Sequence, residues 1–309
     1  MKRYRLHYIP CCVVSALFLA LVLLGCDRKS DTIRIASKDF SEQYILGEIL
    51  RAMVLEHTDL NVELTDGVAG ETSIIMPAMV KGDFDLYPEY DSTAWMTVLK
   101  KPKNINLEAM HQEMAEIYQK EYNMTWLGFY GFDNTYSLAV RRGTAEEYGL
   151  KTFSDLVGHS PEMTFGAGYE FFEREDGYTG LKELYGFGFK EIREMNLSLK
   201  YLALLDKQVD VITIYKTDGR MDNPEIVELV DDRGYFPPAL GGTVIRNEVL
   251  LAHPEVGQAL QKLNGLISNQ EMTAMNAAVD MKGRDAAAVA IEFLRRKELI
   301  NGKQRPGLD

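Results

Sequence analysis

Hydrophobic and polar residues follow two different periods along the first part of the chain. Residues 32–36 alternate with period two, which is typical of a strand, and residues 41–56 carry apolar side chains at helical spacing after Ser41, a plausible N-cap. Strand and helix patterns alternate along this first part of the chain, which predicts a mostly parallel sheet with helices packed on it. Its further elements are a strand over 61–64, a helix over 72–81 and a strand over 84–86.

A second run of alternating elements follows. An amphipathic helix is predicted over 108–122, a strand begins at 137–140, and residues 209–215 form a strongly apolar strand that ends in Tyr215. Two α/β lobes, with the last quarter of the chain returning to the first lobe, fit this order. Further elements are predicted at 153–157, 163–165, 178–185, 197–206, 243–245, 254–269 and 286–299, with a loop at 231–238.

The segment 82–93 presents aromatic side chains where a strand is expected to end. Pro88 fixes φ and cannot donate to a sheet ladder, so we expect strand 84–86 to run into a turn there. Ligands of α/β proteins bind beyond the carboxyl ends of strands. Tyr90, with Thr93 close behind it, is therefore a candidate for contacting a ligand, whereas the alternative is a core tyrosine with its hydroxyl satisfied.

The first residues have the features of a targeting segment. Lys2, Arg3 and Arg5 precede an apolar run over 11–24, which is shorter than the ~20 residues that span a membrane. The small residue before Cys26 resembles the lipobox of bacterial lipoproteins. We expect a signal peptide over 1–25, a lipid on Cys26 and a linker over 26–31; an uncleaved anchor or a plain secretory signal is the alternative.

Composition narrows the possible chemistry. All three cysteines lie within the first 26 residues, so the rest of the chain can form no disulfide and offers no thiol nucleophile. A net charge of −12 argues against nucleic acid as a partner and suits a cationic ligand, although it is also ordinary for solubility.

Signatures of catalysis are absent from the sequence. The histidines lack ligand spacing, and no nucleophile elbow, phosphate loop or dinucleotide fingerprint occurs. The acidic run over 83–91 lacks the spacing of a calcium loop and is interpreted as a solvated strand edge. We therefore predict neither an enzyme nor a cofactor or metal site.

Tyrosines and cations recur at predicted strand ends. Lys38 follows the first strand, Arg174 follows the strand at 163–165, and Tyr136 and Tyr215 border strands of the second run. Aromatic faces attract a quaternary ammonium by cation–π interactions of about 0.5–2 kcal/mol each. Arginine, lysine and a hydroxyl group suit a carboxylate at the other end of such a ligand.

Six ordered segments resemble one known family, the lipoprotein substrate-binding subunits of osmoprotectant ABC transporters for glycine betaine, carnitine and choline. The resemblance covers about residues 32 to 300. It is carried by residues 37–43, 82–90, 131–136, 170–177, 215–220 and 231–238.

This resemblance implies a type II periplasmic-binding-protein fold, an α/β fold with a ligand cleft between two lobes. The first lobe would comprise 32–135 and 240–309, and the second 136–239. The implied partners are a small quaternary amine and the permease and ATPase subunits of the transporter, with a monomeric protein held outside the cytoplasm by its lipid. The implied ligand contacts are Tyr90, Tyr136, Tyr215 and Asn134 around the ammonium, and Lys38, Thr93 and Arg174 at the carboxylate.

The sequence also departs from the family pattern. Ala239 stands where a further cage tyrosine is expected, and Glu71 and Asp91 add negative charge near the expected cleft. These changes suggest weaker glycine betaine binding or a bulkier trimethylammonium compound such as ergothioneine. Tyr235 of the loop is expected to substitute for the missing tyrosine. The alternatives are a receptor retuned to another cationic ligand and, from a different class, a structural or adhesive surface lipoprotein.

Overall fold

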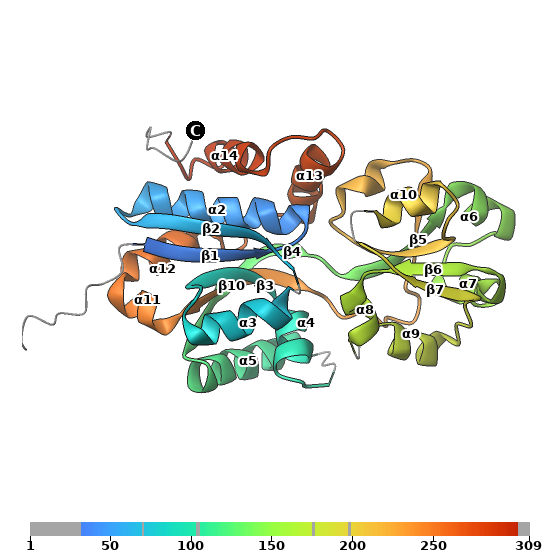
Figure 1. Cartoon of the computed structure of the whole chain (residues 1–309), viewed down its shortest axis with the longest axis horizontal. Coiled ribbons are helices and arrows are strands. Elements are labelled where there is room, and N and C mark those ends of the chain that lie inside the picture. Colours follow the sequence, from blue (N-terminus) through green and yellow to red (C-terminus); the bar gives the residue numbers. More distant parts are fainter. Residues whose placement is uncertain (1–31, 70, 103–105, 175–176, 197–198, 302–309) are drawn as a thin grey trace, which may run out of the picture. The chain divides into compact units, whose positions relative to one another are not determined.

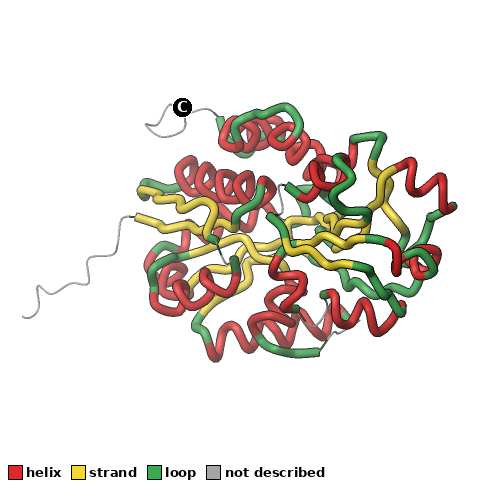
Figure 2. Tube along the Cα trace, turned by 45° about the vertical axis from the view of Figure 1, so that its right-hand side comes forward, coloured by secondary structure: helices red, strands yellow, loops and turns green. Residues whose placement is uncertain are grey.

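The protein's fold is taken from a computed structural model that describes residues 32–69, 71–102, 106–174, 177–196 and 199–301. The expected signal peptide, Cys26 and the linker lie outside the described residues. The described chain forms two five-stranded sheets, each flanked by helices (Figures 1 and 2). None of the helices in this part of the chain is long and apolar enough to cross a membrane.

The first sheet combines the beginning and the later part of the chain. Its order is β2-β1-β3-β10-β4, with β1 parallel to β2 and β3, and β10 antiparallel to both β3 and β4. The return of the chain to this sheet through β10 makes one lobe from two distant segments. The strands are β1 (Thr32–Lys38), β2 (Asn61–Val68), β3 (Leu86–Tyr90), β4 (Met124–Asp133) and β10 (Leu240–Arg246).

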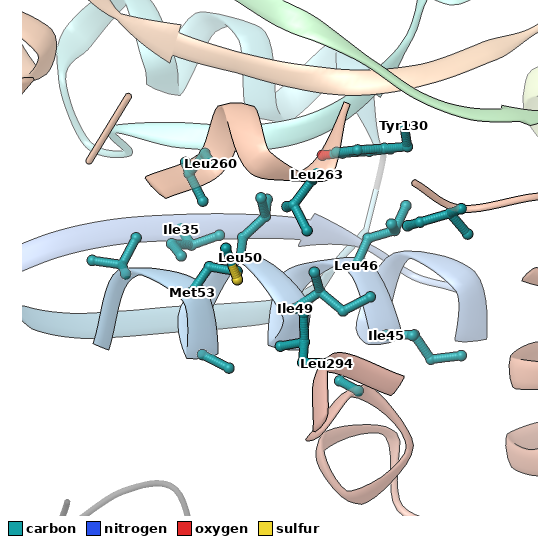
Figure 3. Packing of buried hydrophobic residues seen from close by; sticks show 14 of the residues in the cluster. Ile35, Ile45, Leu46, Ile49, Leu50, Met53, Tyr130, Leu260, Leu263 and Leu294 are labelled. Carbon is teal, nitrogen blue, oxygen red and sulfur yellow. The ribbon is translucent and has the colours of Figure 1, made fainter. Parts of the chain in front are cut away.

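Helices cover both faces of this sheet. The long helix α2 (Ser41–His57) packs Ile45, Ile49 and Met53 against the sheet and its neighbouring helices, as Figure 3 shows for part of this core. The neighbours on that side are α12 (Pro254–Leu260), α13 (Asn269–Asp280) and α14 (Ala286–Arg296), with α11 (Asn247–Ala252) beside them. A second apolar cluster lies with α3 (Thr72–Lys81) and α5 (Leu107–Glu121) and contains the fully buried Tyr87.

The second sheet has the order β7-β6-β8-β5-β9. Its core is rich in aromatic residues, among them the fully buried Phe153, Phe165 and Phe171. The strands are β5 (Tyr136–Arg141), β6 (Thr164–Ala167), β7 (Glu191–Glu194), β8 (Val211–Tyr215) and β9 (Ile226–Leu229). The helices are α6 (Arg142–Tyr148), α7 (Phe153–Val157), α8 (Tyr169–Glu173), α9 (Tyr178–Tyr185) and α10 (Lys200–Leu205).

Two short segments join the sheets and lie side by side. The chain passes from β4 to β5 through residues 134–135 and returns from β9 to β10 through 230–239. The backbone N–H of Asn134 donates to the Ala239 carbonyl over 2.8 Å, and the Ala239 N–H donates to the Asp133 carboxylate over 2.8 Å. The two-lobed α/β architecture predicted from the sequence is thus confirmed.

The prediction of a turn at Pro88 is wrong. Strand β3 runs from Leu86 to Tyr90, and Pro88 pairs with Thr243 of β10 in the middle of the sheet. Since β3 pairs with β1 only at Leu86, the edge facing β1 has no ladder beyond that residue for proline to interrupt.

Two other sequence predictions also differ from the structure. Strand β4 was not predicted, because Gly128 and Gly131 have φ of +118° and +117° and irregular pairing that break the alternation of its side chains. The single helix predicted over 254–269 is instead α12, which ends at Leu260, and a new helix begins at Asn269 behind a Ser268 capping box.

Candidate functional site

A row of aromatic rings lines the cleft between the two lobes. Phe40 stacks between Tyr90 and Tyr215, with ring centroids 6.4 and 5.9 Å away and interplanar angles of 19° and 14°. Tyr215 continues the row to Tyr136 at 4.7 Å, and Phe236 lies 5.8 Å beyond Tyr136. All five rings line one cavity of about 30 Å³, so the row presents π faces and edges to the same enclosed space.

Strand geometry brings these rings together. Tyr90 ends β3, and Tyr136 at the start of β5 pairs directly with Tyr215 at the end of β8. The Tyr215 hydroxyl donates to the Tyr136 hydroxyl oxygen over 3.1 Å. The three tyrosines singled out in the sequence therefore line one cavity, and the register of the second sheet fixes two of them as neighbours.

Phe40 is an aromatic residue that the sequence reasoning missed. It lies between the end of β1 and the start of α2, two residues after Lys38. The signal that could have found Phe40 is its position just beyond the end of β1, where the sequence reasoning singled out tyrosines and cations but no phenylalanine. Its place between Tyr90 and Tyr215 links the aromatic residues of one lobe to those of the other.

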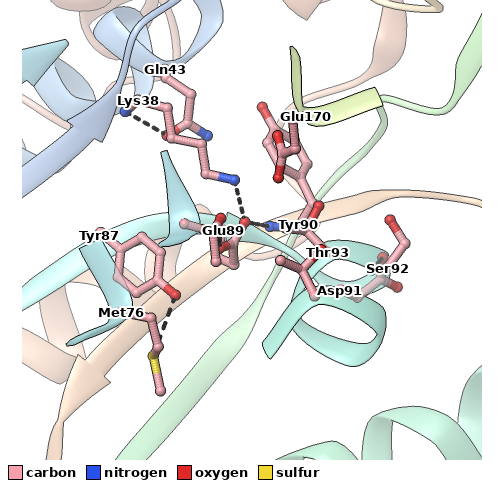
Figure 4. A network of polar contacts seen from close by, with 12 residues as sticks. Lys38, Gln43, Met76, Tyr87, Glu89, Tyr90, Asp91, Ser92, Thr93 and Glu170 are labelled. Carbon is pink, nitrogen blue, oxygen red and sulfur yellow. Dashed lines mark hydrogen bonds and ion pairs between the residues drawn. The ribbon is translucent and has the colours of Figure 1, made fainter. Parts of the chain in front are cut away.

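Lys38 lies at the first-lobe end of the cavity and has a buried partner. Its ammonium is 2.6 Å from a Glu89 oxygen and 5.1 Å from the Tyr90 ring centroid, and the other Glu89 oxygen accepts the Thr72 hydroxyl over 2.6 Å (Figure 4). Burial alone would lower the pKa of Lys38, but the Glu89 carboxylate, together with Glu170 and Glu71, outweighs burial and raises it. Lys38 is thus a charged group held in place by its own lobe.

Arg174 and Thr93 meet across the cleft. Arg174 Nη1 donates to Thr93 Oγ1 over 3.0 Å, and the guanidinium carbon lies 5.9 Å from the Tyr136 ring centroid. Glu170, one turn earlier in the chain, has an oxygen 3.9 Å from the same Arg174 nitrogen. The structure therefore brings two of the three residues expected at a carboxylate into direct contact, with Lys38 lining the same cavity as Thr93.

Asn134 belongs to a buried network at the joint between the lobes. Its side-chain amide donates to Glu42 over 2.9 Å, and the same Glu42 carboxylate accepts the hydroxyls of Tyr90 and Thr217, each over 2.6 Å. Burial raises the pKa of Glu42, while the hydrogen bonds from Thr217 and Tyr90 oppose that rise. Asn134 lines the cavity, and its amide group orients the carboxylate that holds Tyr90.

The loop before β10 supplies Phe236 to the cavity. Tyr235, suggested from the sequence as a substitute for the missing tyrosine, instead donates its hydroxyl to the Gly177 carbonyl over 2.9 Å and packs edge-on against Phe236. Ala239 lines the cavity as a small residue and uses its backbone to join the two connecting segments. The loop aromatic that reaches the cavity is therefore Phe236.

The two additional acids noted in the sequence have different environments. Glu71 adopts φ +49° and lines the cavity together with Glu170 of the other lobe; burial, followed by the charge of Glu170, raises the pKa of Glu71 well above its ordinary value. Asp91 is fully buried and bonds to the His111 ring over 2.7 Å and to the Leu240 N–H over 2.8 Å. Only Glu71 therefore adds its carboxyl group to the cleft.

The interpretation of residues 83–91 as a solvated edge is wrong for three of the four acids. Asp85, Glu89 and Asp91 are buried, and Asp85 forms a two-pronged contact with Arg34. Each of these carboxylates contacts a different basic side chain: Arg34 contacts Asp85, Lys38 contacts Glu89 and His111 contacts Asp91. Within the described residues, no group of three or more histidine, cysteine or acidic side chains is arranged to hold a metal ion.

The arrangement suits recognition of a small charged molecule. The aromatic row offers π faces to a cation without hydrogen-bond donors, and Arg174, Thr93 and Lys38 offer donors to an anionic group. The cavity sits between two lobes that are joined by two short segments, which is the geometry in which one lobe can close on the other around a ligand.

Comparison with known proteins agrees with this geometry. Residues 31–296 match the family described as the substrate binding domain of ABC-type glycine betaine transport system. The chain is 35% identical over 307 residues to the carnitine transport binding protein OpuCC of Listeria monocytogenes, covering 98% of this chain and 99% of that protein. It is 37% identical over 298 residues to the ergothioneine transport permease/ergothioneine binding protein EgtU of Helicobacter pylori, covering 96% of this chain but 53% of that longer protein.

The solved structures agree in fold. A crystal structure of a glycine betaine/carnitine/choline ABC transporter protein superposes with a TM-score of 0.71 at 33% identity, covering 87% of this chain and all of that one. The type II periplasmic-binding-protein fold expected from the sequence is confirmed. Proteins of this kind are extracytoplasmic solute-binding components of ABC importers, which is not an enzyme class. The chain belongs to the family of substrate-binding domains of ABC-type glycine betaine transport systems.

Proposed function

We propose that this protein captures a quaternary-amine solute in the cleft and delivers it to the permease of an ABC importer. The observation that carries the proposal is the row of rings formed by Tyr90, Phe40, Tyr215 and Tyr136 around one cavity. A trimethylammonium group cannot donate hydrogen bonds and is weakly hydrated, so ring faces can replace its water. Each such contact contributes about 0.5–2 kcal/mol.

The carboxylate of the same ligand would bind at the other end of the cavity. Arg174 already donates to the Thr93 hydroxyl, and both groups can turn to a carboxylate that enters between them. Lys38 adds positive charge from the first lobe, although Glu89 neutralises much of it. A zwitterion with both charges close together therefore fits the cavity better than a simple cation such as choline.

The identity of the quaternary amine is drawn from relatives and from Glu71. OpuCC is a carnitine transport binding protein, and EgtU binds ergothioneine. Glu71 brings an acid into the cleft at φ +49°, a conformation that favours glycine. The carboxyl group of Glu71 in the cleft favours a ligand that is larger than glycine betaine and carries a hydrogen-bond donor for this carboxyl group.

The remaining parts of the proposal concern location and partners. A lipid on Cys26 would hold a monomeric protein at the outer face of the cytoplasmic membrane, beside the permease and its ATPase. The protein itself would carry no catalytic activity. The lobes would close on the ligand, and the permease would recognise the closed form.

Isothermal titration calorimetry of the full-length protein with glycine betaine, carnitine, choline and ergothioneine tests the proposal. We expect saturable binding of at least one zwitterionic quaternary amine, and weaker or no binding of choline. No heat and no rise in melting temperature with any of the four at millimolar concentration would contradict the assignment and favour the structural-lipoprotein alternative.

A further inference from the structure

Glu42 is a buried carboxyl group that lies behind the aromatic row. It is 3% exposed, and no ion pair between described residues includes it. It lines a small separate cavity of about 40 Å³, and Phe40, Asn134 and Tyr215 line both this cavity and the ligand cavity. The carboxyl group of Glu42 is therefore near the ligand cavity but is not among the groups that line it.

Both carboxyl oxygens of Glu42 are surrounded by hydrogen-bond donors. Oε1 accepts the Tyr90 hydroxyl over 2.6 Å and the Asn134 amide over 2.9 Å, and Oε2 accepts the Thr217 hydroxyl over 2.6 Å and the Asn276 amide over 2.9 Å. Burial raises the pKa of Glu42, but a protonated carboxyl would turn its O–H toward a group that already donates. Glu42 also lies in the first turn of α2, where the helix dipole favours negative charge. These surroundings suit the ionised form.

The charges around the small cavity do not balance. Three carboxyl groups line it, those of Glu42, Asp218 and Asp280, and two cationic groups, those of Lys200 and Arg220. Arg220 pairs with Asp280 over 3.1 Å. One negative charge more than the positive charges therefore remains beside the aromatic row, where burial makes an uncompensated charge costly. A cation bound against the rings would offset it.

Tyr90 connects the charge of Glu42 to the ligand cavity. The Tyr90 ring lines that cavity, while its hydroxyl donates to the Glu42 carboxylate. Hydrogen-bonded groups polarise one another in a low-dielectric interior, so a phenol that donates to a carboxylate has a more negative ring face. Such a face attracts a quaternary ammonium more strongly. Glu42 can thus act on a bound cation both by its own charge and through the Tyr90 ring.

We propose that Glu42 is the counterion of the ligand's quaternary ammonium and determines the preference of the cleft for a cationic over a neutral head group. It acts across the ring layer and through the Tyr90 hydroxyl without contacting the ligand, so it is a positioning residue. This inference rests on the proposed function and names a residue that determines the specificity of the same cleft.

Two ligands of the same shape but different charge test the proposal. Glycine betaine carries a trimethylammonium next to its carboxylate, and tert-butylacetate has the same outline with a neutral carbon in place of the nitrogen. Calorimetric titration of the full-length protein with glycine betaine, and displacement of glycine betaine by tert-butylacetate, give both affinities. Where another quaternary amine binds the wild type more tightly, that amine and its tert-butyl analogue replace the pair.

Glu42→Gln keeps the size of the side chain and removes its charge. Glycine betaine should bind this variant about tenfold more weakly, whereas the affinity for tert-butylacetate should change by less than about twofold. The melting temperature should also fall, because the glutamine amide group faces side chains that already donate. A loss of folding alone would affect both ligands alike, so the ratio of the two affinities reports the charge.

Glu56→Gln is the matched control. Glu56 is also a buried acid of α2, but it lies near the far end of that helix. Both affinities of this variant should equal those of the wild type.

Tyr90→Phe gives a second test if Glu42→Gln does not fold. It keeps the ring and the Glu42 carboxyl group but removes the hydroxyl that joins them. Glycine betaine should bind about threefold more weakly, and tert-butylacetate should again change by less than about twofold.

A parallel loss of both ligands in the folded variants, or an unchanged affinity for glycine betaine, would overturn the role of Glu42 while the proposed function stands. If the wild type binds none of the four quaternary amines, the proposed function fails and the role of Glu42 fails with it.

Discussion

The two lobes each contribute one buried lysine beside the aromatic row, and these lysines have opposite surroundings. Lys38 of the first lobe forms an ion pair with Glu89, and the pKa of its ammonium is raised. Lys200 of the second lobe is 1% exposed and forms no hydrogen bond with any described group. Its ammonium lies 4.9 Å from the Tyr215 ring centroid and 5.2 Å from that of Tyr201, and burial lowers its pKa to about 8.

This difference indicates that the two sides of the cleft are built in different ways. On the first-lobe side, the Lys38–Glu89 pair and the Tyr90–Glu42 hydrogen bond are complete within that lobe. On the second-lobe side, Arg174 finds Thr93 across the cleft, and Lys200 and Thr213 have unpaired polar atoms. We infer that substitutions in the first lobe cost stability, whereas those in the second lobe chiefly change binding and closure.

The largest expected effect is on the buried pair of the first lobe. Lys38→Met leaves the Glu89 carboxylate buried without its cation, so the free energy of unfolding should fall by about 3–5 kcal/mol. Urea denaturation measures this loss. The matched control is Arg193→Met, which breaks an exposed pair with Glu191 and should cost about 0–1 kcal/mol. Equal losses in the two variants would show that the first-lobe pair is not a structural element.

The next effect concerns the contact between the lobes at Gly219. A Cβ at this position would lie 2.1 Å from the backbone nitrogen of Ala277 in α13, so one lobe must move away from the other. Gly219→Ala should weaken ligand binding roughly 30-fold, about 2 kcal/mol, because closure is opposed. Calorimetry measures the affinity, and Gly143→Ala, where a Cβ meets nothing within 4 Å, is the control. Unchanged affinity in Gly219→Ala would mean that binding does not require this contact.

A smaller effect, with a defined pH dependence, concerns Lys200. The pKa of Lys200 falls from 10.5 to about 8 on folding. Below pH 8 the ammonium is charged in both states, and burying that charge lowers the stability of the folded state. Wild-type stability should rise between pH 8 and 10.5, since the unfolded chain still binds that proton there. Lys200→Met should therefore be more stable than the wild type at pH 7, by about 1–2 kcal/mol, with the gain shrinking above pH 8.

Urea denaturation at pH 7 and pH 10 tests this dependence, with the exposed Lys182→Met as the control. The control should show no pH-dependent difference from the wild type. A loss of stability in Lys200→Met at pH 7 would mean that Lys200 has a compensating partner in solution.

The sequence predicted elements well where the local pattern and the tertiary environment agree. The helix predicted over 72–81 is α3, Thr72–Lys81, and the helix predicted over 41–56 is α2, Ser41–His57. Prediction failed where long-range pairing overrides the local pattern. Pro88 sits in a central strand because pairing with β1 stops before it, and the glycine irregularities of β4 hide its alternation.

The candidate site was predictable only as a set of residue types. The segments around Lys38, Tyr90 and Tyr215 could be found through strand ends and family resemblance. The pairing of Lys38 with Glu89 and the unpaired hydroxyl of Thr213 depend on contacts between distant segments, which no local pattern encodes. Phe40 was missed for a different reason. Its position after β1 could be seen in the sequence, but its ring was not counted among the aromatic faces of the site.

The central claim is that the aromatic row, including its second-lobe tyrosines, holds the ligand. Calorimetric titration of Tyr215→Ala and Trp126→Ala with the tightest ligand tests it most directly, because Trp126 packs against Tyr118 and Phe129 in an apolar cluster of the first lobe. We predict that Tyr215→Ala weakens binding about tenfold or more, and Trp126→Ala by less than about twofold. Equal losses in the two variants, or no loss in Tyr215→Ala, would contradict the account.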